Sequence, residues 1–538
     1  MQRIRISNQR LLITFLWVLA NATLVFGSVH ASAEDGQALV NAKCSACHAS
    51  SGKGRWDRIS DGRRTPEGWD MTVARMSYAH GLKVSRDERA SIVKFLADEF
   101  GLAPEESAPY RYILEKRPSI VESPGDKLIG ETCARCHSYA RIALQRRTEN
   151  EWRKLVHFHV GQYPVIEIQA GGRDRNWFEI ADGEVSASLG KRYGLVSDSW
   201  QRWRTRPTKD LSGTWRVAGH QPGRGAYDGE ARIARVSDDR YNVSVSYRFA
   251  NGSVETGVGS AVVYTGFEWR ATLKQGEREV NQVMTVSGTG MEISGRWFDA
   301  AHDSIGGFVR GVRVDVGGSP TVLALHPEMI KAGERGRIAI VGTNLNGEVR
   351  FGPDVTVRQV VESSKERLVV EVDVNKDASE GARSVSVGHA QSPNLLKVYR
   401  KVDYLKITPE HPMARVGGGG GAMEKVPVQL EAVGFSNGAD GKRGTEDDLK
   451  LGVVPAKWSK ANLNRVAEEM KDSVYAGELS GEGLFTPSVA GPNPIRKFKT
   501  NNAGELRVTA SYKDGARTVN DSVPLIVTVQ RFNDPPIR

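Results

Sequence analysis

The stretch NAKCSACHAS, residues 41–50, contains the pentad CSACH at residues 44–48, and a second pentad, CARCH, occupies residues 133–137. Together they hold all 4 cysteines of the 538-residue chain. On a helical turn, two cysteines three residues apart face the same side, so both thiolates reach the vinyl groups of one haem while the histidine binds its iron. This spacing is typical of c-type haem attachment. We expect two covalently bound haems, held by Cys44, Cys47 and His48 and by Cys133, Cys136 and His137.

A zinc site made of paired C-x-x-C knuckles is the main alternative to haem. Zinc would not require a histidine after each cysteine pair, and both pentads have one. With every cysteine used for haem, the sequence predicts neither a structural disulfide nor a cysteine nucleophile. Motifs of other catalytic classes are also missing from the sequence, namely G-x-S-x-G, H-E-x-x-H and the P-loop.

The two pentads belong to an internal repeat. After the first pentad come RRTPEGW at residues 63–69 and LADEFGL at residues 96–102. After the second come RRTENEW at residues 146–152 and LGKRYGL at residues 189–195. Three landmarks in the same order indicate a duplicated, helix-rich unit of about 85–90 residues.

The repeat also suggests the sixth iron ligands. Seven residues after Trp69 comes Met76, and seven residues after Trp152 comes His159. A thioether and an imidazole are both ordinary axial ligands of haem iron. The expected axial pairs are therefore His48 with Met76 and His137 with His159. The alternatives are Met71 or His80 in the first unit and His157 in the second.

The two ligand pairs predict a direction of electron flow. A His/Met iron usually has the higher reduction potential, because a thioether favours the reduced state. Electrons would then enter at the His137 haem and leave from the His48 haem. Two filled axial positions leave no place for oxygen or peroxide, so the haems are expected to transfer electrons rather than activate a substrate.

The first 33 residues have the pattern of a secretory signal. A basic start containing Arg3 precedes an apolar run at residues 11–26, and Ala31-Ser32-Ala33 forms a small-residue cleavage site. We expect cleavage and a periplasmic location, with an uncleaved N-terminal anchor as the alternative. No later apolar run approaches 18 residues, so no membrane span is expected. The formal charge of +10 is spread along the chain and is no footprint for nucleic acid.

Past residue 206 the sequence changes from helical to strand patterning. Apolar and polar residues alternate over residues 242–249, and Asn251-Gly252 is a strong hairpin signal. We expect a multidomain chain with a mainly α dihaem cytochrome c domain followed by three antiparallel all-β domains. The expected parts are a signal peptide at 1–33, cytochrome c units at 34–117 and 118–206, a β-barrel at 207–317, an immunoglobulin-like sandwich at 318–400 and a second such β-sandwich at 401–538.

Two segments of the last part have unusual composition. Five glycines at residues 417–421 are read as a flexible loop, with a close backbone approach as the alternative. The oxygen-rich loop at residues 437–448, around Asp440, has the composition of a calcium site. Lys442 and Arg443 inside it favour a solvated turn instead.

The duplicated pentads, the R-R-T-x-x-x-W element and the following β domains together resemble the alpha subunit of quinohemoprotein amine dehydrogenase, over the whole mature chain. The resemblance implies a periplasmic heterotrimer with a propeller subunit and a small subunit that carries cysteine tryptophylquinone. That quinone oxidises a primary amine to an aldehyde and ammonia. The two haems pass the electrons to a soluble acceptor, a blue copper protein or a small cytochrome c. No catalytic residue is implied on this chain.

Two other functions compete with this interpretation. One is an autonomous dihaem enzyme of the peroxidase type, which needs one iron with an open sixth position. The other is a β-sandwich binding protein with an accessory cytochrome. Co-purification with a quinone-bearing small chain distinguishes the amine dehydrogenase subunit from both.

Overall fold

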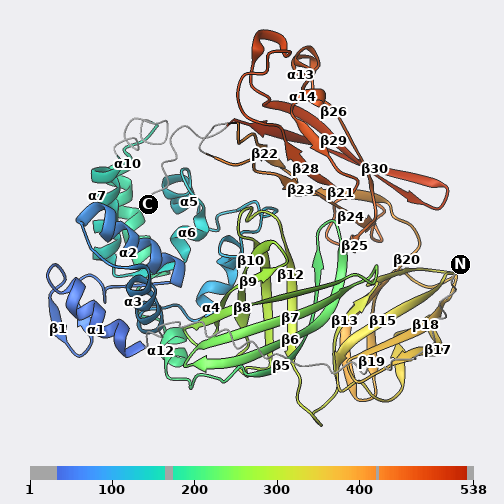
Figure 1. Cartoon of the computed structure of the whole chain (residues 1–538), viewed down its shortest axis with the longest axis horizontal. Helices are drawn as coiled ribbons and strands as arrows, with labels where there is room; N and C mark the ends of the chain where they lie inside the picture. The colour runs from blue at the N-terminus through green and yellow to red at the C-terminus, as the bar shows by residue number, and fades with distance from the viewer. Residues whose placement is uncertain (1–32, 164–173, 420–422, 530–538) are drawn as a thin grey trace, which may run out of the picture.

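The computed structural model of the chain describes residues 33–163, 174–419 and 423–529 (Figure 1). The predicted signal peptide and part of the glycine run lie outside these residues. Helices are concentrated before residue 205. They are α1 (Ala33–Cys44), α2 (Pro66–His80), α3 (Arg86–Glu99), α4 (Pro104–Ser107), α5 (Lys127–Cys133), α6 (Tyr139–Ala143), α7 (Glu149–Gln162), α10 (Trp177–Ile180), α11 (Ser186–Arg192) and α12 (Asp198–Arg204).

The repeated R-R-T element forms the same local structure in both units. Thr65 and Thr148 cap α2 and α7, and each side-chain oxygen accepts a hydrogen bond from a backbone N–H in the first turn. The arginine pairs lie in β3 (Gly62–Arg64) and β4 (Gln145–Arg147), which pair antiparallel with Arg63 opposite Arg146. We call this pair of strands the ribbon. It joins the two units through the equivalent segment of each.

The next part of the chain is a closed barrel of eight antiparallel strands, in the order β10-β11-β12-β5-β6-β7-β8-β9. Alternate side chains point inward, and Trp215, Tyr227 and Trp269 are almost fully buried among them. The predicted barrel is confirmed. Its strands are β5 (Gly213–Gln221), β6 (Gly225–Ser237), β7 (Arg240–Phe249), β8 (Val254–Tyr264), β9 (Glu268–Gln275), β10 (Arg278–Val286), β11 (Glu292–Asp299) and β12 (Gly306–Arg313).

Two four-stranded sheets follow the barrel, in the orders β13-β15-β18-β17 and β14-β20-β19-β16. They enclose a single core of valine, isoleucine and leucine side chains. The strands are β13 (Thr321–His326), β14 (Met329–Lys331), β15 (Arg335–Thr343), β16 (Val349–Phe351), β17 (Val355–Ser363), β18 (Arg367–Val374), β19 (Gly381–Val387) and β20 (Ala390–Tyr399).

The last part has three small sheets, in the orders β21-β24-β25, β22-β30-β29-β26 and β23-β28-β27. Two short helices, α13 (Arg465–Met470) and α14 (Asp472–Tyr475), accompany them. The strands are β21 (Tyr404–Thr408), β22 (Met413–Arg415), β23 (Val428–Gln429), β24 (Glu431–Ser436), β25 (Leu449–Val453), β26 (Lys457–Asn462), β27 (Gly477–Leu479), β28 (Leu484–Pro487), β29 (Gly504–Asp514) and β30 (Arg517–Thr528).

The expected fold class needs three corrections. The β parts are not purely antiparallel, because β14 pairs with β20 and β22 pairs with β30 in parallel. The last part is not all-β, since it contains α13 and α14. The description "mainly α" was too strong: the N-terminal part also holds β3, β4 and the short pair β1 (Ser50–Gly52) and β2 (Arg55–Trp56), and strands outnumber helices in the chain. The immunoglobulin-like assignment stays a prediction.

The helical part lies against the barrel (Figure 1). Charged side chains contribute to the contact between the two parts. Arg270 of β9 donates to Glu67 of α2 at 2.6 Å, and Lys94 of α3 lies 2.9 Å from Asp239. Thr265, just after β8, donates its backbone N–H to Asp98 at 2.7 Å. The barrel is therefore the platform on which the two helical units rest.

Candidate haem centres

The two pentads lie at equivalent helix ends. Cys44 is the last residue of α1, and Cys133 is the last residue of α5. The backbone N–H groups of Cys47 and His48 both donate to the carbonyl of Cys44, at 3.1 and 2.9 Å, which keeps the first pentad in a helical turn. Cys44 and Cys133 are half-buried, Cys47 and Cys136 are exposed, and none forms a disulfide.

Three predicted histidine ligands hold their rings in the same way. The Nδ1 atom of His48 lies 3.0 Å from the carbonyl oxygen of Asp57, and that of His137 lies 3.1 Å from the oxygen of Ser138. The Nδ1 atom of His159 lies 2.7 Å from the oxygen of Leu155. A ring that donates Nδ1–H to a carbonyl presents Nε2 as its free lone pair, which is the usual arrangement around a metal-bound histidine.

The rings of His137 and His159 lie near each other, with their planes tilted by 47°. Their ring centres are 6.5 Å apart. Metal–imidazole bonds are about 2.0–2.1 Å long and the ring centre lies about 1.2 Å beyond the nitrogen, so two imidazoles on opposite sides of one metal ion have centres roughly 6.4 Å apart. Burial lowers the pKa of both histidines, and the charge of Arg141 lowers them further. The lowered pKa favours the neutral imidazole, which is the metal-binding form.

The first unit offers Met76 at the position that corresponds to His159. Met76 lies on α2 and is half-buried, whereas Met71 and His80 on the same helix are exposed. The sulfur of Met71 accepts a hydrogen bond from Arg141 at 3.5 Å. The structure places the rings of the second predicted pair, His137 and His159, close together, and the pairing of His48 with Met76 stays a prediction.

His157, the alternative ligand of the second unit, points elsewhere. Its ring is exposed, and its Nε2 lies 2.8 Å from a carboxylate oxygen of Asp182. The nitrogen that would bind iron is thus already occupied. The residues of both pentads, together with His159 and Met76, fit covalently attached haem in donor type and in the freedom of their ligand atoms.

Sequence reasoning missed the carboxylate that holds the two units together. Glu106 of α4 is buried and accepts hydrogen bonds from Arg63 at 2.8 Å and from Arg146 at 3.1 Å. Burial alone would raise its pKa, but the two guanidinium groups outweigh burial and hold the pKa at about 2. The only sign of this contact in the sequence was a glutamate shortly after the LADEFGL element. The second unit has no glutamate at the equivalent position.

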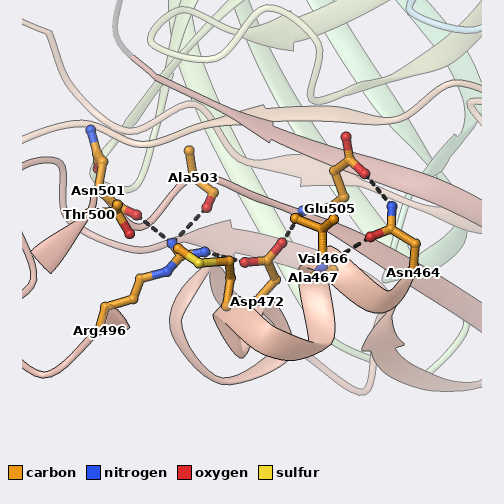
Figure 2. Close-up of a pocket in the computed structure, with 10 residues that line it drawn as sticks. Asn464, Val466, Ala467, Asp472, Arg496, Thr500, Asn501, Ala503 and Glu505 are labelled. Atoms are coloured by element: carbon orange, nitrogen blue, oxygen red, sulfur yellow. Dashed lines mark hydrogen bonds and ion pairs between the residues drawn. The ribbon is translucent and has the colours of Figure 1, made fainter. Parts of the chain in front are cut away.

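A pocket in the last part of the chain is lined by residues around α13 and α14 (Figure 2). Its buried Arg496 forms an ion pair with Asp472 and donates to the carbonyls of Asn501 and Ala503. The charges of Arg496 and Asp472 thus neutralise each other inside the pocket. In the Asp440 loop, Asp447 and Asp448 accept hydrogen bonds from backbone N–H groups of the loop itself.

Two helical units with paired haem-ligand residues, followed by β domains that begin with a closed barrel, define a multidomain haem protein. Family models make the assignment specific: the chain belongs to the alpha-subunit family of quinohemoprotein amine dehydrogenase. The haem-binding model of that subunit matches residues 34–200, and the models of its domains II, III and IV match residues 208–314, 319–400 and 405–537. The chain is thus a haem-binding subunit of an amine dehydrogenase, which is an oxidoreductase.

Other comparisons add little. No curated protein matches the chain. Among solved structures, a redesigned β-barrel bound to DFHBI is 18% identical over 19% of this chain and 94% of its own, with a TM-score of 0.17. The titin domains Z1Z2 in complex with telethonin are 12% identical over 39% of this chain and 94% of theirs, with a TM-score of 0.14. Such low scores carry no argument. No helix in the described part of the chain has the length and apolarity to cross a membrane.

Proposed function

We propose that this chain is the dihaem electron-transfer subunit of a periplasmic quinohemoprotein amine dehydrogenase. It receives electrons from a cysteine tryptophylquinone on a small partner subunit, where a primary amine is oxidised to an aldehyde and ammonia. It delivers them to a soluble blue copper protein or small cytochrome c. A propeller subunit completes the heterotrimer. Family membership supports the complex. The neighbouring rings of His137 and His159 support the electron-transfer role of this chain.

Each predicted residue has a defined task in this proposal. Four cysteines, Cys44, Cys47, Cys133 and Cys136, form the thioether links, and His48 and His137 are the proximal ligands. Met76 and His159 are the sixth ligands. When bound, the haems supply reversible one-electron oxidation and reduction. The backbone carbonyls that accept from the imidazole Nδ1 atoms fix the ring orientations, and the apolar cores around Trp69 and Trp152 exclude water.

The observation that carries the proposal is the 6.5 Å separation between the ring centres of His137 and His159. His137 and His159 would hold a haem iron from both sides, and a haem so held would supply electron transfer rather than substrate activation. A peroxidase needs an open position at one iron, so this separation argues against the peroxidase alternative for the second unit. We assign catalysis of amine oxidation to the partner because the family resemblance places the quinone on the small subunit.

The test is purification of the native protein from the periplasmic fraction. We expect two haems per chain by the pyridine haemochrome assay, together with a quinone-bearing small chain that stays bound through size-exclusion chromatography. Addition of a primary amine should then reduce both haems. Isolation of a stable, lone dihaem monomer would contradict the proposed complex, and a high-spin EPR signal from the fully oxidised protein would favour the peroxidase alternative.

A further inference from the structure

Four arginines lie together on the ribbon and on the elements around it: Arg58, Arg64, Arg75 and Arg147. We call them the arginine cluster. Arg64 of β3 and Arg147 of β4 are almost fully buried, with exposed fractions of 7% and 8%. The guanidinium carbon of Arg64 lies 4.4 Å from the ring centre of Trp69, and that of Arg147 lies 5.5 Å from the ring centre of Trp152. Each tryptophan lies on the helix that carries an expected sixth ligand.

Arg75 extends the cluster to both of those helices. It precedes Met76 on α2, and its guanidinium carbon lies 5.1 Å from the ring centre of Phe158. Phe158 precedes His159 on α7. Burial and the charges of Arg147, Arg75 and Arg58 together hold the pKa of Arg64 well below its usual value, which shows how closely these charges are grouped. The cluster therefore contacts both helices that carry an expected sixth ligand.

The cluster has too little negative charge of its own. The acidic residue that contacts the cluster is Glu151, and its carboxylate lies 3.6 Å from Arg58 and 2.7 Å from Lys154. Arg147 donates twice to the neutral side chain of Gln145. Within the described residues, the side chain of Arg64 makes neither a hydrogen bond nor an ion pair. A buried cation without a counter-ion strongly destabilises a protein. The mature protein therefore needs an anion beside the arginine cluster.

The two copies of the repeat differ at the positions that would satisfy Arg64. The second unit has Gln145 and Glu151, whereas the equivalent residues of the first unit are Gly62 and Gly68. A Cβ atom at Gly62 would lie 3.1 Å from a terminal nitrogen of Arg64, and one at Gly68 would lie 2.9 Å from the Cβ of Arg64. The two glycines of the first unit thus leave room for the Arg64 side chain. They supply no hydrogen-bond partner for its guanidinium group.

We propose that the arginine cluster binds the propionate carboxylates of the haems, with Arg64 as the principal anchor. This inference rests on the proposed function, because it requires the haems. Each haem carries two propionates, and a guanidinium binds a carboxylate through two parallel hydrogen bonds. The resulting positive field disfavours the additional positive charge of ferric iron. The cluster therefore raises the reduction potential of the haem it binds and links the electrostatics of the two centres.

The test compares Arg64→Gln, Arg147→Gln and the wild type as intact dihaem proteins. In a potentiometric titration followed by visible absorbance, we expect Arg64→Gln to lower at least one midpoint potential. A tenfold change in the ratio of oxidised to reduced haem corresponds to 59 mV for one electron. We also expect the propionate-bending bands in the resonance Raman spectrum to move. Arg64→Lys keeps the charge and should move the bands while shifting the potential less.

Arg153→Gln is the matched control. Arg153 lies on α7, loses the same charge, and makes an exposed ion pair with Glu149, so both potentials and the Raman bands should stay as in the wild type. Wild-type potentials and bands in Arg64→Gln, with only a lower melting temperature, would overturn the proposal and leave the cluster a structural tie. Potentials that follow phosphate concentration without a Raman change would assign the cluster to a free anion instead.

The outcome separates this inference from the proposed function. Haem content is measured first, by pyridine haemochrome. A dihaem protein that shows the expected Raman and potential shifts but takes no electrons from an amine-reduced partner contradicts the proposed function alone. A dihaem protein that takes those electrons but shows neither shift contradicts the arginine cluster alone.

Discussion

Met76 and His159 occupy the same place in the repeat, seven residues after Trp69 and Trp152, yet they differ in chemistry. A thioether stabilises ferrous iron, whereas an imidazole favours the ferric state. In the proposed assignment, the duplicated fold would give two centres with different potentials by changing one residue type at one position. The difference was visible in the sequence because the repeat placed these two residues in register.

Substitution Met76→His should make the two centres alike. We expect the higher of the two potentials to fall by roughly 59 mV or more, a tenfold change in the redox ratio, while the lower one changes little. A potentiometric titration measures both. Met71→His is the control, because Met71 is exposed and should leave both potentials unchanged. If Met71→His moves the higher potential and Met76→His does not, the assigned ligand is wrong.

Substitution His159→Ala should open the sixth position of the second iron. The remaining ligand, His137, leaves a five-coordinate ferric centre, so we expect a high-spin EPR signal from one of the two haems. The matched control is His157→Ala, since His157 lies on the same helix and its ring is engaged with Asp182. A high-spin signal in His157→Ala, with a low-spin spectrum in His159→Ala, would exchange the two assignments.

At the scale of elements, the ribbon of β3 and β4 is short, yet it joins the two helical units. Each strand has 3 residues, and their pairing sets Arg63 opposite Arg146. One side of the ribbon is neutralised in part by Glu106, and the other side carries the arginine cluster. The same repeated motif thus both joins the two units and places positive charge beside the helices that carry the expected sixth ligands.

Substitution Glu106→Gln should destabilise the helical part in a pH-dependent way. The pKa of Glu106 is lowered from 4.5 to about 2 in the folded protein. Its carboxylate therefore stabilises the fold above pH 4.5, and this contribution disappears as the pH falls from 4.5 towards 2. The shift corresponds to about 3 kcal/mol. Denaturant unfolding followed by Soret absorbance at pH 7 and at pH 3 measures the difference.

The control for that experiment is Glu105→Gln, which removes the same charge from the preceding, exposed residue. We expect its unfolding free energy to stay within about 0.5 kcal/mol of the wild type. The stabilising role of the Glu106 carboxylate is contradicted if Glu106→Gln lowers the unfolding free energy as much at pH 3 as at pH 7. It is also contradicted if Glu105→Gln lowers the unfolding free energy by an equal amount.

Much of this element structure was predictable from local sequence. The alternation of β7 and the duplication of the helical unit were recognisable because strand burial and internal repeats follow fixed residue spacings. The ribbon was not, since three-residue strands rich in arginine have no alternating pattern. The parallel pairing of β14 with β20 was missed for a similar reason, because a three-residue strand gives no sign of a distant partner. The partner of Arg64 could not be predicted because the described chain does not supply one.

At the scale of the whole molecule, the barrel supports the helical part through buried charge rather than through an apolar interface alone. Arg270 is central to this contact. It donates to Glu67 of α2 at 2.6 Å and to its barrel neighbour Glu268 at 2.7 Å. Arg296 adds hydrogen bonds to the backbone carbonyls of Glu115 and Lys116. The position of the haem units relative to the β domains thus depends on a few arginines of the barrel.

Substitution Arg270→Ala should uncouple the two parts. It leaves the buried carboxylate of Glu268 and the partly exposed carboxylate of Glu67 near each other without their shared cation. Loss of one partner from a fully buried ion pair costs roughly 3–5 kcal/mol, and the exposure of Glu67 places the expected cost below that range. In differential scanning calorimetry of the dihaem protein, we expect the transition that accompanies loss of Soret absorbance to move to lower temperature and away from the remaining transitions. Arg232→Ala is the control, because Arg232 is an exposed residue of the same barrel paired with Glu230 and should change stability by no more than about 0.5 kcal/mol. Equal effects of the two substitutions would show that the contact through Arg270 does not hold the helical part on the barrel.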